Sequence, residues 1–359
     1  MKVLFQCRSN LFTLSGGDKI QILETKEALE KKNIEIAIST TNQPDLTGID
    51  IFHLFNPSLG SLKPLRECRK KNIPIAISTI HWDMKEYYES ILKINHEYFR
   101  LKPKQYLQNY LRNQFFGLFY NYFWYPKNMR DIKKILELGD VLLPNSQAET
   151  DLIDKQFHLG SRCQAIINGI QMDDPIDKKS FYNKYKIKDF ILCTGRLEYR
   201  KNQFLLIKSL LDNNIPLVFI GNSNFNSGYT NLCKKLADKR KNVYFIDHLK
   251  QKELFSAYAN AKVHALVSWY ETPGLANLEA GYFGCNLAIS DKGSTKEYFK
   301  NYAEYCDPDN LESIKKAVIN AYNKPKNAEL TKHIQNNYTW KKTAEQTLSA
   351  YYLLLEKKR

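Results

Sequence analysis

The chain has 359 residues, of which 43% are hydrophobic, and a formal net charge of +15. This length predicts two domains that each bury a core of their own, and no apolar run approaches the ~20 residues that a membrane-spanning helix needs. The positive charge predicts an anionic partner, which could be a phosphate group, a membrane surface or a nucleic acid.

The cysteines and the N-terminal segment indicate the compartment. The seven cysteines are scattered and form no CxxC pair, and the segment MKVLFQCRSN lacks the long apolar core of a signal peptide. We therefore expect a cytoplasmic protein with reduced thiols, and neither a disulfide framework nor a zinc site.

Short apolar runs alternate with helical stretches along the first half of the chain. Strands are expected at residues 2–7, 34–39, 50–55, 73–78, 141–146 and 163–168, and connecting helices at 17–32, 59–71 and 147–157. The second half repeats this rhythm, with strands expected at residues 190–195, 217–222, 243–247, 263–268 and 286–290.

Near-continuous apolar strands that alternate with helices predict parallel sheets covered on both faces. We therefore expect an α/β protein with two doubly wound domains, residues 1–170 and 171–339, joined near 170–186. The last helix, within residues 340–359, is expected to pack back on the first domain. In such sheets ligands bind at the carboxyl ends of the strands, and a cleft between two domains is the natural site.

Two motifs follow strands of the first domain. Gly16 and Gly17 allow the backbone to approach a ligand at the head of a helix, although a glycine pair is also an ordinary turn. His81 follows the strand at 73–78 and is either a structural residue or a catalytic one. The chain contains neither GxGxxG nor GxxxxGK[ST], which argues against a dinucleotide dehydrogenase and a P-loop protein.

The second domain carries cations and carboxylates at its strand ends. Arg196 and Lys201 flank a loop that leads into a helix near Asn202, which suits a diphosphate, although loop cations often only meet solvent. Glu271 precedes a Pro-Gly turn, and Glu279 falls on the apolar stripe of the following helix, formed by Leu275, Leu278 and Tyr282. The Glu279 head either reaches solvent or a cation, or faces a cleft and binds hydroxyl groups.

Together these segments resemble the retaining GT-B glycosyltransferases of family 4, the glycosyl transferases group 1. The resemblance rests on GRLEYRKN (195–202), YANAKVHALVSWYETPGLANLEAGYFG (258–284) and INGI (167–170). It covers most of the second domain and implies a GT-B fold, with two Rossmann-like domains that face a central cleft. One departure is that the family usually has Gly-Phe-Gly after the first glutamate, where this chain has Thr272-Pro273-Gly274. Because Pro273 lacks the N–H that another residue would offer, the sequence does not predict which sugar is bound.

The resemblance also implies roles for individual residues. Glu279 would bind the ribose hydroxyls, and Glu271 would contact the donor sugar or support the reacting centre. Arg196 and Lys201 would hold the diphosphate and stabilise it as a leaving group, and His81 would lie near the donor sugar. The expected catalytic residues are therefore His81, Arg196, Lys201 and Glu271, and the expected donor-binding residues are Gly16, Gly17, Arg196, Lys201, Glu271, Thr272, Gly274, Leu275 and Glu279.

The expected function is transfer of a hexose, with retention of configuration, from a nucleotide-sugar, expected to be a UDP-sugar, to a glycan or lipid-linked glycan. Cell-surface polysaccharide or lipopolysaccharide biosynthesis is the expected setting. No metal cofactor is expected, because Asp173-Asp174-Pro175 and Asp307-Pro308-Asp309 are interpreted as turns rather than metal-binding triplets. Another GT-B enzyme, such as a nucleotide-sugar epimerase, is an alternative. A nucleic-acid-binding protein is a weaker one, because the basic residues are dispersed over both halves.

A segment within the first domain, residues 82–138, is expected to be a helical insertion. Its stretch 98–130 contains six cations, twelve aromatic residues and no acid. Such a composition favours an anionic membrane surface or a lipid-linked acceptor, and would make the protein peripheral at the inner face of the plasma membrane. Core packing or a groove for a soluble glycan is the alternative. The residues expected to contact the acceptor or membrane are Arg100, Lys102, Lys104, Arg112 and Trp124.

Overall fold

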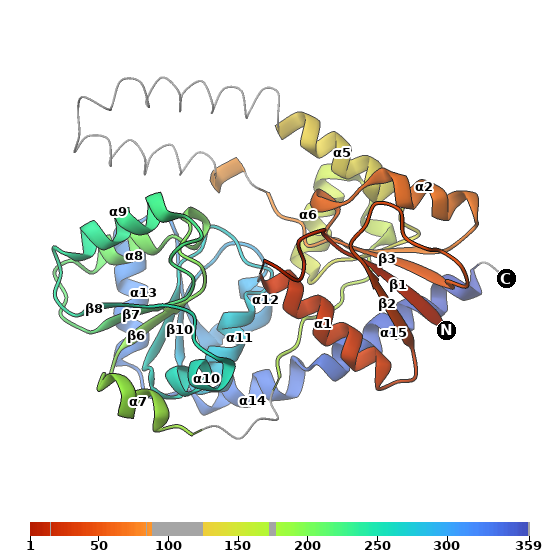
Figure 1. The fold of residues 1–359 in the computed structure, drawn as a ribbon. Coiled ribbons are helices and arrows are strands. Elements are labelled where there is room, and N and C mark those ends of the chain that lie inside the picture. Colours follow the sequence, from red (N-terminus) through yellow and green to blue (C-terminus); the bar gives the residue numbers. More distant parts are fainter. Residues whose placement is uncertain (15, 84, 88–124, 172–176, 358–359) are drawn as a thin grey trace. The chain divides into compact units, whose positions relative to one another are not determined.

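The computed structural model describes residues 1–14, 16–83, 85–87, 125–171 and 177–357. These residues form two compact units (Figure 1). Unit 1 contains the described residues up to 83, those from 125 to 169, and those from 338 onward. Unit 2 contains the described residues between 170 and 337, together with 85–87. The chain therefore leaves unit 1 after Gly169 and returns to it at Tyr338.

Unit 1 is built on a five-stranded parallel sheet with the strand order β2-β1-β3-β4-β5. Side chains of successive strand residues point to opposite faces, so β1 contributes Val3 and Phe5 to one core and Leu4 to the other. Helices α1 and α15 cover the first face, and α2, α5 and α6 cover the second (Figure 1). The elements are β1 (Lys2–Gln6), α1 (Gly17–Glu30), β2 (Glu35–Ser39), β3 (Ile51–Phe55), η1 (Pro57–Leu59), α2 (Leu62–Lys70), β4 (Ile75–Ser78), α5 (Tyr125–Glu137), β5 (Val141–Leu143), α6 (Gln147–Phe157), η3 (Gly160–Arg162) and α15 (Trp340–Glu356).

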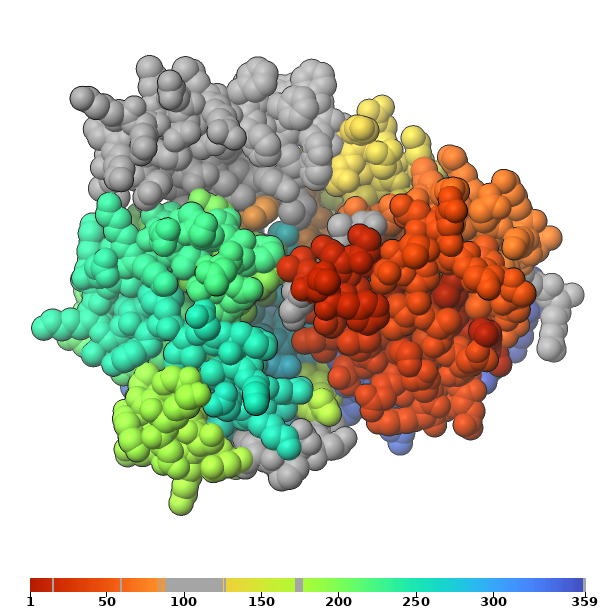
Figure 2. All heavy atoms as spheres, viewed as in Figure 1, coloured from red at the N-terminus to blue at the C-terminus, as the bar shows by residue number. Residues whose placement is uncertain are grey.

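The C-terminal helix α15 completes the core of unit 1. Tyr351 is fully buried, and its hydroxyl lies 2.6 Å from Nδ1 of His53 on β3. The other ring nitrogen of His53 lies 2.9 Å from the Ser78 hydroxyl on β4. At the other end of α15, the Thr343 hydroxyl donates to the Ile167 carbonyl at 2.8 Å. In Figure 2 the visible face of unit 1 is formed mostly by its N-terminal elements, in red and orange, with α15 in blue at its margin.

The prediction of a strand at residues 163–168 is wrong. This segment runs beside β5, where Gln164 N–H donates to the Leu142 carbonyl at 2.8 Å and Ile166 N–H to the Pro144 carbonyl at 2.7 Å. Only an isolated bridge between Leu142 and Cys163 results. Because Pro144 has no N–H to donate in return, a regular ladder cannot form there.

Unit 2 is built on a six-stranded parallel sheet with the order β11-β10-β9-β6-β7-β8. The chain moves outward from β6 through β7 to β8 and then returns to the other side of β6 with β9. The carboxyl ends of β6 and β9 thus meet at a topological switch point. The elements are α7 (Ser180–Tyr185), β6 (Ile191–Thr194), η4 (Tyr199–Lys201), α8 (Gln203–Ser209), β7 (Leu217–Ile220), α9 (Ser227–Ala237), β8 (Val243–Ile246), α10 (Gln251–Asn260), β9 (Val263–Leu266), α11 (Leu275–Tyr282), β10 (Asn286–Ser290), α12 (Thr295–Phe299), η5 (Lys300–Tyr302), β11 (Ala303–Cys306), α13 (Leu311–Asn323) and α14 (Ala328–Asn337).

Most of the expected basic and aromatic insertion lies outside the described residues. Arg100, Lys102, Lys104, Arg112 and Trp124 all fall there. Residues 125–130 are described and form the start of α5. Within the described part of the chain, no helix is long and apolar enough to cross a membrane.

Candidate functional site

Two glycines let the loops after β6 and β7 approach each other closely. Gly195 follows β6 with φ +130°, and Gly221 follows β7 with φ +154°. A Cβ at Gly221 would lie only 2.1 Å from the Gly195 carbonyl oxygen. Any other residue at 221 would force the loops apart, so glycine at this position preserves the shape of the strand ends.

A buried cluster of charges lies beyond the ends of β6 and β9. Glu271 is 7% exposed, and its Oε1 accepts from Lys201 Nζ at 2.5 Å and from Arg200 Nη1 at 3.2 Å. Arg200 also donates to Glu198 at 2.9 Å, and Arg196 lies 3.4 Å from the same Glu198 oxygen. Lys201 and Arg200 both belong to η4, so this short turn directs two cations at one carboxylate.

The pKa shifts show that the charges of this cluster act on one another. Burial opposes ionisation of Glu271, but Lys201 and Arg200 outweigh burial and hold its pKa below the ordinary value. Burial and the neighbouring Arg200 lower the pKa of Lys201, even though Glu271 acts in the opposite direction. Burial also opposes the charge of Arg200, but Glu271 and Glu198 outweigh it and raise the pKa of that guanidinium. The carboxylate is therefore ionised at neutral pH and faces two cations.

Two neighbouring loops fix the backbone around Glu271. Ser294 N–H donates to the Glu271 carbonyl at 2.9 Å. Gly293 has φ +74°, and a Cβ there would lie 2.2 Å from the same carbonyl oxygen. On the other side, Asn202 is fully buried, and its amide donates to the Val267 carbonyl at 3.1 Å and to the Pro308 carbonyl at 2.8 Å. The Thr272–Pro273 peptide that follows Glu271 is cis.

Glu279 lies on α11, where the expected apolar stripe is partly wrong. Leu278 is buried as expected, but Leu275 and Tyr282 are only half-buried. The buried face is formed instead by Asn277, Leu278, Ala280 and Gly281. A Cβ at Gly281 would lie 2.6 Å from Ile334 Cδ1, so this side of α11 packs tightly on α14. Glu279 itself is half-buried and accepts from the Tyr258 hydroxyl at 3.2 Å.

The second unit matches known proteins in sequence. Residues 175–340 match the family model described as glycosyl transferases group 1. An uncharacterized glycosyltransferase of Methanocaldococcus jannaschii is 27% identical over 196 residues, which are 50% of this chain and 50% of that protein. A glycogen synthase of Clostridium botulinum is 29% identical over 180 residues, which are 45% of this chain and 37% of that protein. The chain thus matches about half the length, or less, of these relatives.

Solved structures match nearly the whole chain. A sucrose-phosphate synthase from Thermosynechococcus elongatus superposes with a TM-score of 0.77 at 13% identity and covers 99% of both chains. The chain has the GT-B fold. Anabaena HepE, in complex with UDP and glucose, superposes with a TM-score of 0.68 at 15% identity and covers 98% of this chain and 99% of that one. Both expected α/β domains with parallel sheets are therefore confirmed.

Within this GT-B chain, the expected site residues divide between the two units. Arg196, Lys201, Glu271, Thr272, Gly274, Leu275 and Glu279 lie in unit 2, after β6, after β9 and along α11. Gly16, Gly17 and His81 lie in unit 1. α1 begins at Gly17, and its preceding loop is held by an ion pair between Arg8 and Asp18 at 2.6 Å.

His81 is tied into the body of unit 1. It is 6% exposed, and its Nε2 lies 2.7 Å from Gln156 Oε1 on α6. Its backbone N–H donates at 2.7 Å to Glu149, a buried carboxylate at the start of the same helix. Burial lowers the pKa of His81 despite the bond to Gln156, so the ring is neutral at pH 7.

Five residues of the cluster and its surroundings did not follow from the sequence. Arg200 sits beside Lys201 in the segment YRKN, but only the folded chain shows that it reaches Glu271. The buried polar side chains have no signature in the sequence, because only the packing of unit 2 removes them from water. The five are Arg200, Asn202, Tyr258, His264 and Asn277.

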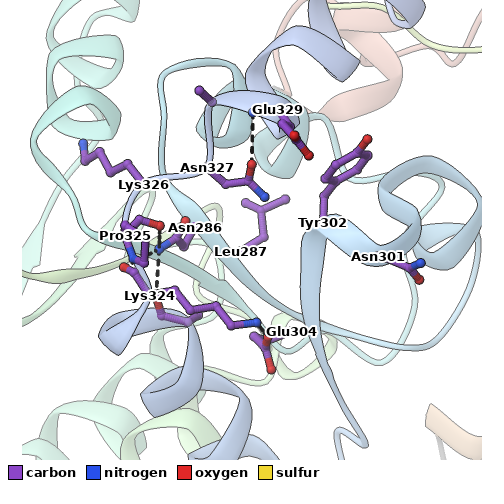
Figure 3. A pocket seen from close by; sticks show the side chains of 12 residues that line it. Asn286, Leu287, Asn301, Tyr302, Glu304, Lys324, Pro325, Lys326, Asn327 and Glu329 are labelled. Carbon is purple, nitrogen blue, oxygen red and sulfur yellow. Dashed lines mark hydrogen bonds and ion pairs between the residues drawn. The ribbon is translucent and has the colours of Figure 1, made fainter.

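A cavity of about 290 Å³ lies elsewhere in unit 2, where β10 and β11 begin (Figure 3). The Asn286 amide fixes its wall by donating to the Lys324 and Pro325 carbonyls at 3.0 and 3.1 Å. Lys324 and Glu304, which both line the cavity, form an ion pair. The cavity therefore lies at the amino ends of β10 and β11, whereas the Glu271 cluster lies at the carboxyl edge of the same sheet.

Proposed function

We propose that this chain is a glycosyltransferase that takes a sugar from a nucleotide-sugar and transfers it with retention of anomeric configuration. The observation that carries the proposal is the Lys201–Glu271–Arg200 cluster at the switch point of unit 2. It lies inside the segment that matches glycosyl transferases group 1. Convergent cations of this kind suit phosphate groups. Anabaena HepE, whose structure is in complex with UDP and glucose, has the same fold.

The site residues take the following roles in this proposal. Glu279 accepts hydrogen bonds from the ribose hydroxyls, because an ionised carboxylate is an acceptor with two oxygens. Lys201 and Arg196 hold the diphosphate, and Arg196 is the more accessible, with 29% of its side chain exposed against 12% for Lys201. Glu271 fixes Lys201 and contacts hydroxyls of the donor sugar.

The reaction breaks the bond between the anomeric carbon and the diphosphate oxygen, and the electron pair leaves with that oxygen. The acceptor hydroxyl oxygen forms a new bond to the same face of the anomeric carbon, and its proton passes to the departing diphosphate. Negative charge grows on the diphosphate as the bond breaks, so preorganised Lys201 and Arg196 lower the barrier. His81 of unit 1 lies near the donor sugar in this proposal, and retention rests on the family resemblance.

Binding and stereochemistry test the proposal. In a thermal-shift panel of UDP, GDP, ADP and their sugar conjugates, one series should raise the melting temperature, because a ligand that binds only the folded state stabilises it. NMR of the first-formed glycoside should show the anomeric configuration of the donor. Activity should survive EDTA, and loss in EDTA with recovery in Mg²⁺ or Mn²⁺ would refute a metal-independent transfer.

The acceptor proposal rests on the sequence. The acid-free, aromatic-rich stretch 98–130 suits an anionic membrane surface that carries a lipid-linked glycan. The protein should float with anionic vesicles at low salt, and a variant with Arg100, Lys102, Lys104 and Arg112 changed to Glu should not. Equal flotation of the two proteins, with full activity on a water-soluble glycan, would refute this acceptor.

A further inference from the structure

The backbone between Thr79 and His81 is strained. Ile80, the residue between them, has φ +41°, in the left-handed region that β-branched residues rarely adopt. Ile80 is 7% exposed, so its side chain belongs to the packed interior of unit 1. Strain of this kind persists only where the surroundings hold the backbone in place, and it is concentrated at functional sites. Another group of unit 1 must therefore hold this turn.

Glu149 on α6 holds the turn on both sides of Ile80. Its Oε1 accepts from the Thr79 hydroxyl and, at 2.7 Å, from the His81 backbone N–H. Its Oε2 accepts from the Asn145 N–H at 2.9 Å. Glu149 is 3% exposed and Thr79 is fully buried, so bulk water does not compete for these bonds. The two donors that flank Ile80 thus share one buried acceptor atom.

The grip of Glu149 on this turn does not depend on its charge. Burial raises the pKa of Glu149, while the bonds from Thr79, His81 and Asn145 act in the opposite direction. A protonated carboxyl group keeps its carbonyl oxygen as an acceptor, and an ionised one accepts at both oxygens. Thr79 and His81 therefore have an acceptor in either state.

The same helix fixes the ring of His81. Oε1 of Gln156, further along α6, lies 2.7 Å from His81 Nε2, and Nε2 of Gln156 donates to Asp83 at 3.3 Å. Because an amide oxygen can only accept, His81 Nε2 must carry a proton. Burial lowers the pKa of His81, so the ring is neutral at pH 7 and its Nδ1 is an acceptor.

We propose that Glu149 is a positioning residue for His81. It holds the strained turn at Ile80, and this turn places the His81 ring against Gln156 in one orientation and one tautomer. Without Glu149 the turn relaxes to an ordinary backbone angle, and the ring leaves Gln156. The reaction concerned is the sugar transfer proposed above, in which His81 lies near the donor sugar, so this inference rests on that proposed function.

The first test follows the His81 ring by ¹⁵N NMR of the full chain without ligand. In the wild type the ring should be protonated at Nε2 and titrate with a pKa below the ordinary 6.5. Glu149→Gln keeps an oxygen for Thr79 and His81, and should preserve this signature. Glu149→Met is of similar length but has no oxygen, so its His81 ring should show mixed tautomers and a pKa closer to 6.5. An unchanged ring in Glu149→Met would overturn the positioning role.

The second test measures release of UDP from UDP-glucose, or of ADP from ADP-glucose if the wild type binds adenine nucleotides. Glu149→Met should lower kcat about 100-fold, the usual effect of a misplaced group at a reacting centre. It should leave the affinity for the free nucleotide unchanged, because the expected diphosphate and ribose contacts lie in unit 2. In a His81→Ala background the same substitution should have no further effect, since it acts through His81. An equal loss of kcat in both backgrounds would contradict the proposal.

Thr343→Val is the matched control. It removes a buried hydroxyl that donates to the Ile167 carbonyl in the same unit, and it should change neither the NMR signature nor kcat. Should Glu149→Met not fold, Thr79→Val removes only one of the two bonds that flank Ile80. The His81 amide should then exchange faster with solvent, and an unchanged exchange rate would overturn the role of Glu149.

The two tests fail in different ways. A wild type that binds none of these nucleotides would overturn the proposed function, and unchanged kcat in His81→Ala would remove His81 from the site. In both cases the NMR comparison still decides whether Glu149 positions His81, because it needs neither ligand nor turnover.

Discussion

Lys201 Nζ lies 2.5 Å from Glu271 Oε1, although the two residues are 70 positions apart in the chain. Arg200 donates to the same oxygen at 3.2 Å. The cluster is therefore asymmetric. Removal of one cation leaves the carboxylate paired, whereas removal of the carboxylate leaves two buried cations facing each other. The variants below use this asymmetry to separate effects on catalysis from effects on folding.

Lys201→Ala should impair turnover far more than stability. Arg200 still pairs with Glu271 in this variant, so the fold should survive. Turnover should fall about 100-fold or more, because the charge that Lys201 meets is largest in the transition state. Steady-state kinetics and thermal melting measure the two effects. Lys324→Ala, which breaks an ion pair at the opposite edge of the sheet, is the control and should leave turnover unchanged. Equal turnover in both variants would remove Lys201 from the site.

Glu271→Gln should destabilise unit 2 strongly. The loss of one partner from a buried ion pair costs about 3–5 kcal/mol, since the remaining charges stay desolvated. The control is Glu304→Gln, whose partner Lys324 has 62% of its side chain exposed, and which should cost less than about 1 kcal/mol. Urea unfolding followed by circular dichroism measures both. A Glu271→Gln variant as stable as the control would show that the cluster does not contribute to folding.

The stabilising effect of Glu271 should depend on pH. Because its pKa in the folded chain lies below the ordinary 4.5, the ionised carboxylate stabilises the fold fully above that pH. This contribution is lost as the pH falls through the folded pKa. The difference in unfolding free energy between the wild type and Glu271→Gln should therefore be constant from pH 8 to about 5 and shrink below. A difference that grows on acidification would reverse the assigned direction of the shift.

Substitution of Gly293 tests the backbone packing around Glu271, and substitution of Gly48, in unit 1, is the matched control. Their φ angles are +74° and +68°, but a Cβ at Gly48 meets no atom within 4 Å, whereas one at Gly293 would lie 2.2 Å from the Glu271 carbonyl oxygen. Gly48→Ala should cost about 1 kcal/mol from backbone strain alone. Gly293→Ala should cost at least about 1 kcal/mol more and weaken nucleotide binding, because Glu271 must move. Thermal melts of equal depression would argue against this contact.

The strands of both sheets were largely predictable because buried parallel strands are apolar throughout. β11 was missed, since it is an edge strand of sequence AEYC whose first three residues are only half-buried. The false strand at 163–168 is apolar enough, but its neighbour Pro144 lacks the N–H that a ladder needs. A pattern of hydrophobicity shows where a segment can be buried. It does not show whether the neighbouring segment offers the backbone N–H and C=O groups that a strand must pair with.

The candidate site was predictable where a local motif carried it. Glu271 and Glu279 flank a Pro-Gly turn, and Lys201 follows a strand, so each has a sequence signal. Arg200 and Asn277 have none: Arg200 matters through its contact with Glu271, 71 positions along the chain, and Asn277 through its complete burial on α11. Asn277 in particular occupies a helix position that a leucine would fill equally well in any pattern of helical periodicity.

The return of α15 to unit 1 has a consequence for biosynthesis. Ala344, Ala350, Tyr351 and Leu354 lie in the same core as Val3 and Phe5. While the ribosome is still making unit 2, only α1 covers this face of the sheet in the nascent first unit, and the part on which α15 will pack is exposed. The half of the protein that is translated first is therefore the half that matures last, and its exposed apolar face is the natural place for a chaperone to bind in the interval.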